Sequence, residues 1–324
     1  MKRNKLVEMA CIMFLGVLMN AGCASMGAIN IPVDQLKEKY GTEADRYVSY
    51  RGMQVRYRDE GSGPVLVLLH GACSSLETWE GWKRNLGESY RIIRIDIPGF
   101  GMTGPAPDKS QYTKEQAVKF LHDFMGVMGV EKFSLAGNSL GGYISWNYAL
   151  IYPEKVTRLI LIDPVGYHQK LPGLLALASN PVMRPSARSM MPRGLLRKAV
   201  YQVYGDKSKV TPAVVERYYD FAMREGNKRS YVDIFAELRR QNDSPDLPKE
   251  IPNISVPTLV MWGTKDEWIP FAHFESWKRD LPSARFIAYE GAGHVPMEEI
   301  PEKTSADAKR FLEGPAETND AAGR

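Results

Sequence analysis

The residues Gly137-Asn138-Ser139-Leu140-Gly141 fit the pattern Gly-x-Ser-x-Gly, and they directly follow a short apolar run at residues 133–136. This order can place a serine hydroxyl on a sharp turn between a strand and a helix, which is the geometry of a nucleophile elbow. Glycine is needed on both sides because the strained turn brings neighbouring backbone too close for a Cβ atom. A chain of this length matches the pattern by chance in about one case in ten. Other residues must therefore decide whether Ser139 is a nucleophile.

A nucleophilic serine needs a base within hydrogen-bond distance, and the base needs a carboxylate that orients it. His294 is the candidate base because it lies in a glycine-rich segment directly after the apolar run 285–289. Asp266 is the candidate acid because it follows the apolar run 258–262. The chain order serine, acid, histidine is the one that this type of turn requires.

Other acids and histidines are alternatives for these roles. Asp163 also follows an apolar run and is a second candidate acid, although we interpret it mainly as a structural residue of the following turn. His273, at an expected helix start, is a second candidate base. His122 and His168 are expected to be structural or solvated, because one falls inside a helical pattern and the other in the inserted lobe after residue 163.

Acyl chemistry also requires hydrogen-bond donors for a developing oxyanion, each of which can contribute roughly 3 to 4 kcal/mol. The backbone N–H of Leu140, directly after the serine, is the first expected donor. The N–H of Ala72, in a tight turn after the apolar run 65–69, is the second. We expect His70 to support this turn. Cys73 is expected to be a small buried hydrophobe because no base is placed for it.

The elements that must position these residues alternate along the chain between apolar, strand-like runs and helical patterns. Such alternation predicts an α/β fold with a mostly parallel central sheet and helices on both faces. A hairpin is expected at 47–51 and 54–59. The expected buried strands are 65–69, 92–97, 133–136, 159–162, 258–262 and 285–289, and the expected helices are 76–86, 113–128, 140–152 and 302–312.

The alternation stops after residue 162, and segments 211–224 and 229–240 are helical in pattern. We therefore expect a helical cap, residues 164–256, inserted into a core formed by residues 45–163 and 257–313. Residues 23–44 are expected to be a tether containing a short helix at 33–40, and residues 314–324 a disordered tail.

The first residues carry Lys2, Arg3 and Lys5, followed by an uncharged apolar run at 9–19 and then Asn20-Ala21-Gly22-Cys23. This pattern predicts an export signal too short to span a bilayer comfortably. It resembles a bacterial lipoprotein signal, in which residues 1–22 are removed and Cys23 carries the lipid. Asn20 departs from the leucine that is usual there, so ordinary secretion and an uncleaved anchor stay open. By the same resemblance, the absence of Asp after Cys23 favours the outer membrane, on its periplasmic or surface side.

The composition limits the possible partners. The chain of 324 residues has a formal charge of +4, which falls to +2 once Lys2, Arg3, Lys5 and Glu8 are lost with the signal. Nucleic-acid binding has no support from this charge. The spacings of a zinc site are absent, and after processing Cys73 is the one free thiol. The sequence gives no expectation of oligomeric state.

Residues 164–205 contain no acidic residue but carry six basic ones among many leucines and methionines. Such a surface attracts anionic phospholipid head groups, so contact between the cap and a membrane is one interpretation. A cap core with a solvated basic face is the other. The basic residues are Lys170, Arg184, Arg188, Arg193, Arg197 and Lys198.

Together, the chemical motifs resemble the α/β-hydrolase superfamily over residues 45–312. The resemblance rests on His70-Gly71, Trp79, and residues 96–103, 137–142, 263–266 and 293–294. It implies a cofactor-independent serine hydrolase that cleaves carboxylic esters through an acyl-enzyme. Residues 77–82 and 101–105 are similar to a branch of bacterial serine lipases and esterases, which implies lipid-like or other apolar acyl esters.

The resemblance also sets the alternatives. Haloalkane dehalogenases and epoxide hydrolases of this fold use aspartate where this chain has Ser139. Carbon–carbon bond hydrolases of the meta-cleavage-product type share the Gly-Asn-Ser turn and stay the alternative of the same fold. They usually have a Gly-Pro-Gly oxyanion loop and an aromatic residue after the histidine, whereas this chain has residues 72–75 (Ala-Cys-Ser-Ser) and Val295. A non-catalytic binding lipoprotein of the cell envelope is the alternative of another class.

Overall fold

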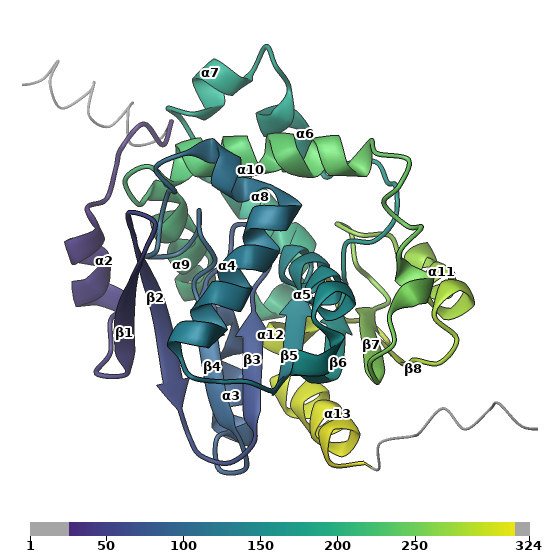
Figure 1. Cartoon of the computed structure of the whole chain (residues 1–324). Coiled ribbons are helices and arrows are strands. Elements are labelled where there is room, and N and C mark those ends of the chain that lie inside the picture. Colours follow the sequence, from purple (N-terminus) through teal and green to yellow (C-terminus); the bar gives the residue numbers. More distant parts are fainter. Residues whose placement is uncertain (1–25, 315–324) are drawn as a thin grey trace, which may run out of the picture.

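The computed structural model describes residues 26–314 (Figure 1). The predicted signal peptide 1–22, Cys23 and residues 315–324 of the predicted tail lie outside the described residues. The centre of the fold is an eight-stranded sheet with the order β1-β2-β4-β3-β5-β6-β7-β8. The strands are β1 Asp45–Tyr50, β2 Met53–Glu60, β3 Val65–Leu69, β4 Arg91–Ile95, β5 Phe133–Asn138, β6 Val156–Ile162, β7 Thr258–Gly263 and β8 Arg285–Tyr289.

The sheet is mostly parallel, which confirms the predicted fold class. Strands β1 and β2 form an antiparallel hairpin, and β2 is antiparallel to β4. The other neighbouring strands pair in parallel. The central strands β3, β5, β6 and β7 are almost fully buried, because their apolar side chains are covered on both faces.

Helices of the core cover the sheet. Helix α4 packs against α5, which contacts β5 and β6, while α3 packs against α13 (Figure 1). Among the described residues, no helix has the length and apolar character needed to cross a bilayer. The core helices are α3 Glu80–Leu86, α4 Lys114–Val127, α5 Leu140–Ile151, α11 Ala272–Asp280, α12 Pro296–Glu299 and α13 Pro301–Glu313.

Five helices are inserted between β6 and β7 and lie over one end of the sheet (Figure 1). In this fully described segment the only β structure is an isolated bridge at Arg224. Helix α6 packs on α10, and α8 packs on α9, and the apolar residues of the cap are continuous with the hydrophobic core of the sheet. Its helices are α6 Gly173–Ser179, α7 Arg184–Ala187, α8 Arg193–Val203, α9 Pro212–Met223 and α10 Asn227–Asn242.

The described part of the predicted tether is docked on the cap rather than separated from it. It contains the expected short helix, α2 Val33–Tyr40. Leu36 is 1% exposed and packs in a small cluster with Phe221 of α9. Lys39 Nζ and the Tyr40 hydroxyl donate hydrogen bonds to Asp220 at 2.7 and 2.8 Å. The sequence predicted a tether because this segment is polar in composition. Its few apolar contacts are with residues far away in the sequence, so no local pattern indicates them.

Candidate active site

Ser139 occupies the expected sharp turn between β5 and α5. Its φ of 55° and ψ of −115° lie in a region of backbone conformation that residues other than glycine rarely adopt. A Cβ atom on Gly137 would lie 2.3 Å from the Gly141 carbonyl oxygen, and one on Gly141 would lie 2.3 Å from the Leu69 carbonyl oxygen. Both glycines are therefore required by backbone contact, as the sequence pattern predicted.

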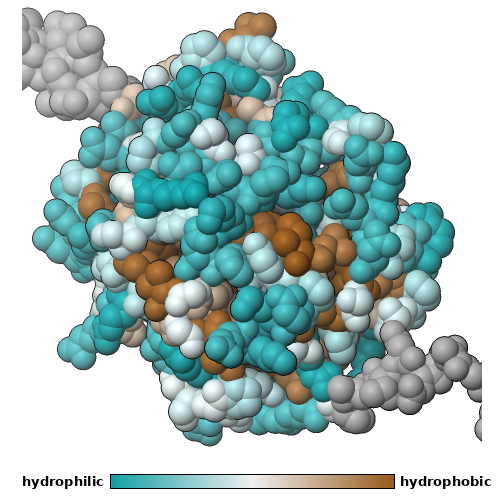
Figure 2. Space-filling view, in the orientation of Figure 1, coloured by the Kyte–Doolittle hydropathy of each residue, from teal (hydrophilic) through white to brown (hydrophobic). Residues whose placement is uncertain are grey.

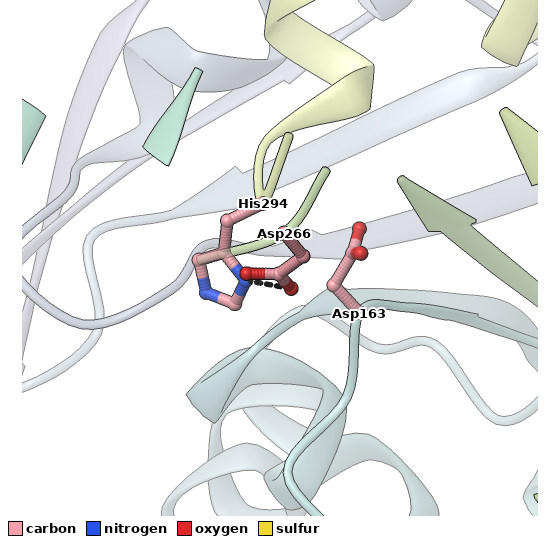
Figure 3. Close-up of side chains that lie close together, drawn as sticks. All are labelled: Asp163, Asp266 and His294. Atoms are coloured by element: carbon pink, nitrogen blue, oxygen red, sulfur yellow. Dashed lines mark hydrogen bonds and ion pairs between the residues drawn. The ribbon is translucent and has the colours of Figure 1, made fainter. Parts of the chain in front are cut away.

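The candidate base and acid meet at the carboxyl edge of the sheet. His294 Nδ1 lies 2.7 Å from Asp266 Oδ2, and the histidine is 3% exposed (Figure 3). The other carboxylate oxygen accepts the backbone N–H groups of Trp268 and Ile269 at 2.7 and 2.9 Å. An ionised carboxylate only accepts hydrogen bonds, so Nδ1–H is the donor and Nε2 keeps a lone pair available for a hydroxyl proton.

Asn138, next to the candidate nucleophile, connects it to the histidine loop. Its side-chain Nδ2 donates to the His294 carbonyl oxygen at 2.9 Å and to the Ile162 carbonyl oxygen at 3.1 Å. The backbone N–H of His294 donates to the Val203 carbonyl oxygen of the cap at 2.8 Å. The histidine backbone is thus held between the serine turn and the cap.

The two candidate oxyanion donors also lie beside this turn. Leu140 is the first residue of α5, and the first amides of a helix have no acceptor within the helix. These amides also form the positive end of the helix dipole. On the other side, a Cβ atom on Gly71 would lie 3.1 Å from Ser139 Cβ, which places the loop of Ala72 directly against the serine.

His70 supports that loop as a neutral, buried residue. Its Nδ1–H donates to the Gly71 carbonyl oxygen at 2.7 Å, and its Nε2 accepts the Ile97 N–H at 3.0 Å. Burial lowers the pKa of His70 to about 4. Burial also raises the pKa of the Cys73 thiol. Both environments fit the structural roles expected from the sequence.

A cavity adjoins the site, and the cap forms much of its wall. Among the described residues that line it, His294 is the only one with an ionisable nitrogen, and none is Lys, Arg, Asp or Glu. The polar lining residues are Ser74, Asn138, Tyr218 and His294; the others are Gly71, Ala72, Cys73, Leu174, Leu196, Ala199, Val200, Val203, Trp268 and Val295.

Glu299 of α12 fixes the histidine loop, a role that the sequence did not indicate. Its carboxylate accepts the backbone N–H of Gly293 at 2.8 Å. It also accepts the N–H groups of Gly205 and Asp206, just after cap helix α8, at 3.0 and 2.7 Å. The loop of His294 and the end of α8 therefore share one buried acceptor.

Glu298 makes a second link between cap and core. It forms an ion pair with Arg217 of α9, and it accepts hydrogen bonds from Tyr204 at 2.6 Å and Thr78 at 2.5 Å. Burial is the largest single influence and opposes ionisation of this carboxyl. The charge of Arg217 and the hydrogen bonds from Thr78 and Tyr204 together outweigh it, so the pKa of Glu298 lies below its usual value.

The alternative residues fall in different places. Asp163 lies at the end of β6 beside Asp266 (Figure 3), and its Oδ1 accepts the Gly263 N–H at 2.9 Å. His273, His122 and His168 do not line the cavity. His122 instead stacks on a tyrosine of α5's end, Tyr152, at a centroid distance of 4.1 Å.

The cluster of Asp163, Asp266 and His294 is the group of described residues that could be considered for a metal ion, because one ligand atom of each lies within 4.8 Å of the others. The 2.7 Å contact between His294 Nδ1 and Asp266 Oδ2 is a direct hydrogen bond that leaves no space for an ion between the two atoms. The donor set therefore fits a proton-transfer site rather than a metal centre.

Comparison with known proteins agrees with this geometry. A sequence model of the alpha/beta hydrolase fold family matches residues 64–301, so the chain belongs to this family. Lipase 1 of Psychrobacter immobilis is 28% identical over 94% of this chain and 97% of its own. A 2-hydroxy-6-oxo-6-(2'-aminophenyl)hexa-2,4-dienoic acid hydrolase of Metapseudomonas resinovorans is 28% identical over 89% of this chain and 98% of its own. The crystal structure of a bacterial membrane phospholipase A superposes with a TM-score of 0.72 and 27% identity, covering 97% of this chain and 99% of that one.

The buried neutral state of His70 predicts a pH-dependent contribution to stability. In the unfolded chain His70 binds a proton near pH 6.5, whereas in the folded chain it does so near pH 4. The unfolded state therefore binds more protons between these values, and the free energy of unfolding falls as the pH drops from about 6.5 to about 4, by up to about 3 kcal/mol. In His70→Asn this part of the fall disappears. Urea unfolding at pH 7, 5.5 and 4.5 measures the difference, and equal pH dependence in both proteins would contradict it.

Proposed function

We propose that this protein is a serine hydrolase that cleaves carboxylic esters with apolar, lipid-like acyl groups. The observation that carries the proposal is the cavity lined by His294 and by Asn138, the residue before Ser139. Apart from His294 and a few uncharged polar side chains, its described lining residues are apolar. Transfer of an apolar acyl chain from water into such a cavity is favourable, because its apolar surface is buried. A charged group would lose its hydration there without a compensating partner.

The geometry supports a two-step acyl-transfer mechanism. Ser139 Oγ attacks the ester carbonyl carbon while His294 Nε2 takes its proton. The N–H groups of Leu140 and Ala72 stabilise the oxyanion, and Asp266 stabilises the imidazolium. His294 then gives the proton to the departing alcohol. Water, deprotonated by His294, attacks the acyl-enzyme; the bond to Ser139 Oγ breaks, His294 returns the proton to this oxygen, and the acid is released.

The alternative of a carbon–carbon bond hydrolase has support from the relative in Metapseudomonas resinovorans, whose name describes a dienoic acid as its substrate. A substrate that carries an ionised carboxylate requires a cation or several donors to replace its hydration. The described residues that line the cavity include no Lys or Arg. This lack of positive charge favours the ester, in agreement with the likeness to Lipase 1 and to the membrane phospholipase A.

The first test is hydrolysis of p-nitrophenyl esters from acetate to palmitate. We expect the wild-type protein to cleave them and to be labelled by a fluorophosphonate. Ser139→Ala should abolish labelling and lower kcat at least about 10³-fold, because the nucleophile is lost. Ser110→Ala, a change at an exposed serine, is the matched control and should act like the wild type.

Two results would contradict the proposal in different ways. A wild-type protein that neither cleaves esters nor reacts with the fluorophosphonate would favour the non-catalytic binding protein. Faster cleavage of a meta-cleavage-type dienoic acid than of any ester would favour the carbon–carbon hydrolase.

We further propose that the enzyme is an exported lipoprotein, anchored through Cys23 in the bacterial envelope and facing a membrane. The described chain starts beside the cap, where the Gly27 carbonyl oxygen accepts the Met191 N–H at 3.3 Å. Four of the eight exposed large hydrophobic side chains among the described residues gather at this corner: Met26, Leu177, Val182 and Met183. Figure 2 shows an apolar projection at the top of the view, over the turn between α6 and α7.

An apolar groove of about 200 Å³ lies at the same corner, between α6, α7 and α8. Leu174 lines both this groove and the cavity beside His294. Arg188 and Arg193 of the cap are exposed, although Arg188 pairs with Asp233 and Arg193 lies over the Tyr219 ring. Apolar groups flanked by basic side chains are the features that bind an anionic bilayer surface.

Changing Arg184, Arg188 and Arg193 together to Gln tests contact between the cap and the membrane. We expect hydrolysis of phospholipid in anionic vesicles to fall at least tenfold at low salt, since each basic residue near such a surface contributes about 1 kcal/mol. Hydrolysis of a short soluble ester should change less than twofold. The difference between variant and wild type should shrink at high salt.

The control replaces the same number of cations outside the cap, Arg84, Lys278 and Lys309, by Gln. An equal loss of vesicle activity in the control, or a loss that salt does not change, would show that the cap arginines have no specific role at the bilayer.

Lipidation is tested by comparing the wild type with Cys23→Ser, both produced in a bacterial host that processes lipoproteins. We expect the wild-type protein to partition into detergent and to carry acyl groups on its N-terminal peptide by mass spectrometry. Cys23→Ser should lose both, because the sulfur that carries the lipid is gone. Cys11→Ser, a change inside the predicted signal, should be processed normally. A Cys23→Ser protein that keeps the acyl groups would contradict the assignment.

A further inference from the structure

One carboxyl group beside the site has no role in the mechanism above. Asp163 is fully buried, and an oxygen of its carboxyl group lies within 4.8 Å of atoms of both Asp266 and His294 (Figure 3). It reaches this position because β6 and β7 are parallel neighbours, so the residues after their carboxyl ends meet. Its backbone N–H donates to the Met261 carbonyl oxygen at 3.0 Å, which fixes the residue at a φ of 46°.

The hydrogen bonds decide which of the two aspartates carries the negative charge. Asp266 accepts the N–H groups of Trp268 and Ile269 as well as His294 Nδ1–H. Asp163 accepts one N–H, that of Gly263, while its Oδ2 is buried and receives no donor. Two adjacent buried carboxyls cannot both ionise without large repulsion, so the better solvated one keeps the charge.

Asp163 is therefore the protonated member of the pair. Burial first, and then the negative charge of Asp266, raise the pKa of Asp163 well above its usual value. Glu299 of α12 adds negative charge from a third side, and Tyr289 of β8 is the neutral titratable group nearby. The side chains of the two aspartates are hydrogen-bonded to each other, so the proton of Asp163 is the one that this bond donates to Asp266.

We propose that Asp163 is a positioning residue that donates its proton to Asp266 in the wild-type enzyme and is a reserve carboxylate for His294 when Asp266 loses its charge. This inference rests on the proposed serine chemistry. When Asp266 is neutral, the main charge that opposes ionisation of Asp163 is gone, while burial, the larger cause of its raised pKa, remains. Asp163 then loses its proton as the pH rises. The resulting carboxylate stabilises the imidazolium that forms on His294 when Ser139 gives up its proton.

A double-mutant cycle on the full chain tests this role, with the second-order rate constant for fluorophosphonate labelling of Ser139 as the readout. Asp163→Asn should lower the rate constant about threefold, because Asn still donates to Asp266 and still accepts from Gly263. Asp266→Asn should lower it strongly. In the Asp266→Asn background, Asp163→Asn should lower the labelling rate constant at least thirtyfold, because the reserve charge is then removed as well.

The pH dependence of Asp266→Asn alone gives a second test that does not need the double variant to fold. Its labelling rate should rise with pH in an additional step, caused by ionisation of Asp163, and this step should be absent from the wild type. Thermal unfolding of each variant shows whether a loss of rate reflects loss of structure.

Two results would overturn the inference: the same factor for Asp163→Asn in both backgrounds, or no additional step in the pH profile of Asp266→Asn. Either would show that Asp163 only maintains the turn after β6. A wild-type protein that is not labelled at all is a different outcome, since it would refute the serine hydrolase itself.

Discussion

The structure of the site depends on the close approach of the β5–α5 turn to the end of β3. Because the backbone at Gly141 lies against the Leu69 carbonyl oxygen, no side chain larger than hydrogen is tolerated there. The resulting strained conformation of Ser139 costs about 1 to 3 kcal/mol, which the buried strands on either side must offset. In return, one turn carries Ser139, presents the Leu140 amide at the start of α5 and directs the Asn138 side chain to the backbone of His294. Three parts of the site are therefore positioned by one turn.

The cap is attached to the His294 loop and to α12 through buried carboxylates. Glu299 holds the His294 loop and the end of α8 through backbone N–H groups, and Glu298 holds α9 through Arg217. Buried ion pairs contribute little net stability, because desolvation offsets their attraction. Their geometry is nevertheless strict, since a displaced partner would leave a buried charge unpaired. We infer that these two glutamates set the position of the cap, and with it the shape of the cavity, more than they stabilise the fold.

The sequence predicts the fold and the candidate triad because both have local signals. Apolar runs mark the buried strands, and Asp266 and His294 follow directly after two of them, so a parallel sheet brings them to one edge. The order of strands in the sheet has no such signal. The sequence therefore placed Asp163 after a strand but could not show that β6 lies next to β7. Contacts between distant polar residues were also missed, as in Glu299 with Gly205 and in Lys39 with Asp220, because neither partner indicates the other.

The uncharged cavity has opposite consequences for the two ends of the proposed reaction. Binding of a neutral ester in this cavity is favourable because apolar surface is buried. The low dielectric also strengthens the attraction between the backbone amides and the oxyanion. The product is a carboxylic acid, which ionises in water. Once ionised, it finds no Lys or Arg in the lining to replace its hydration, so it binds more weakly than the substrate did. The same absence of charge that admits the acyl group thus favours release of the acid, and a cation introduced into the lining would retain the product and slow turnover.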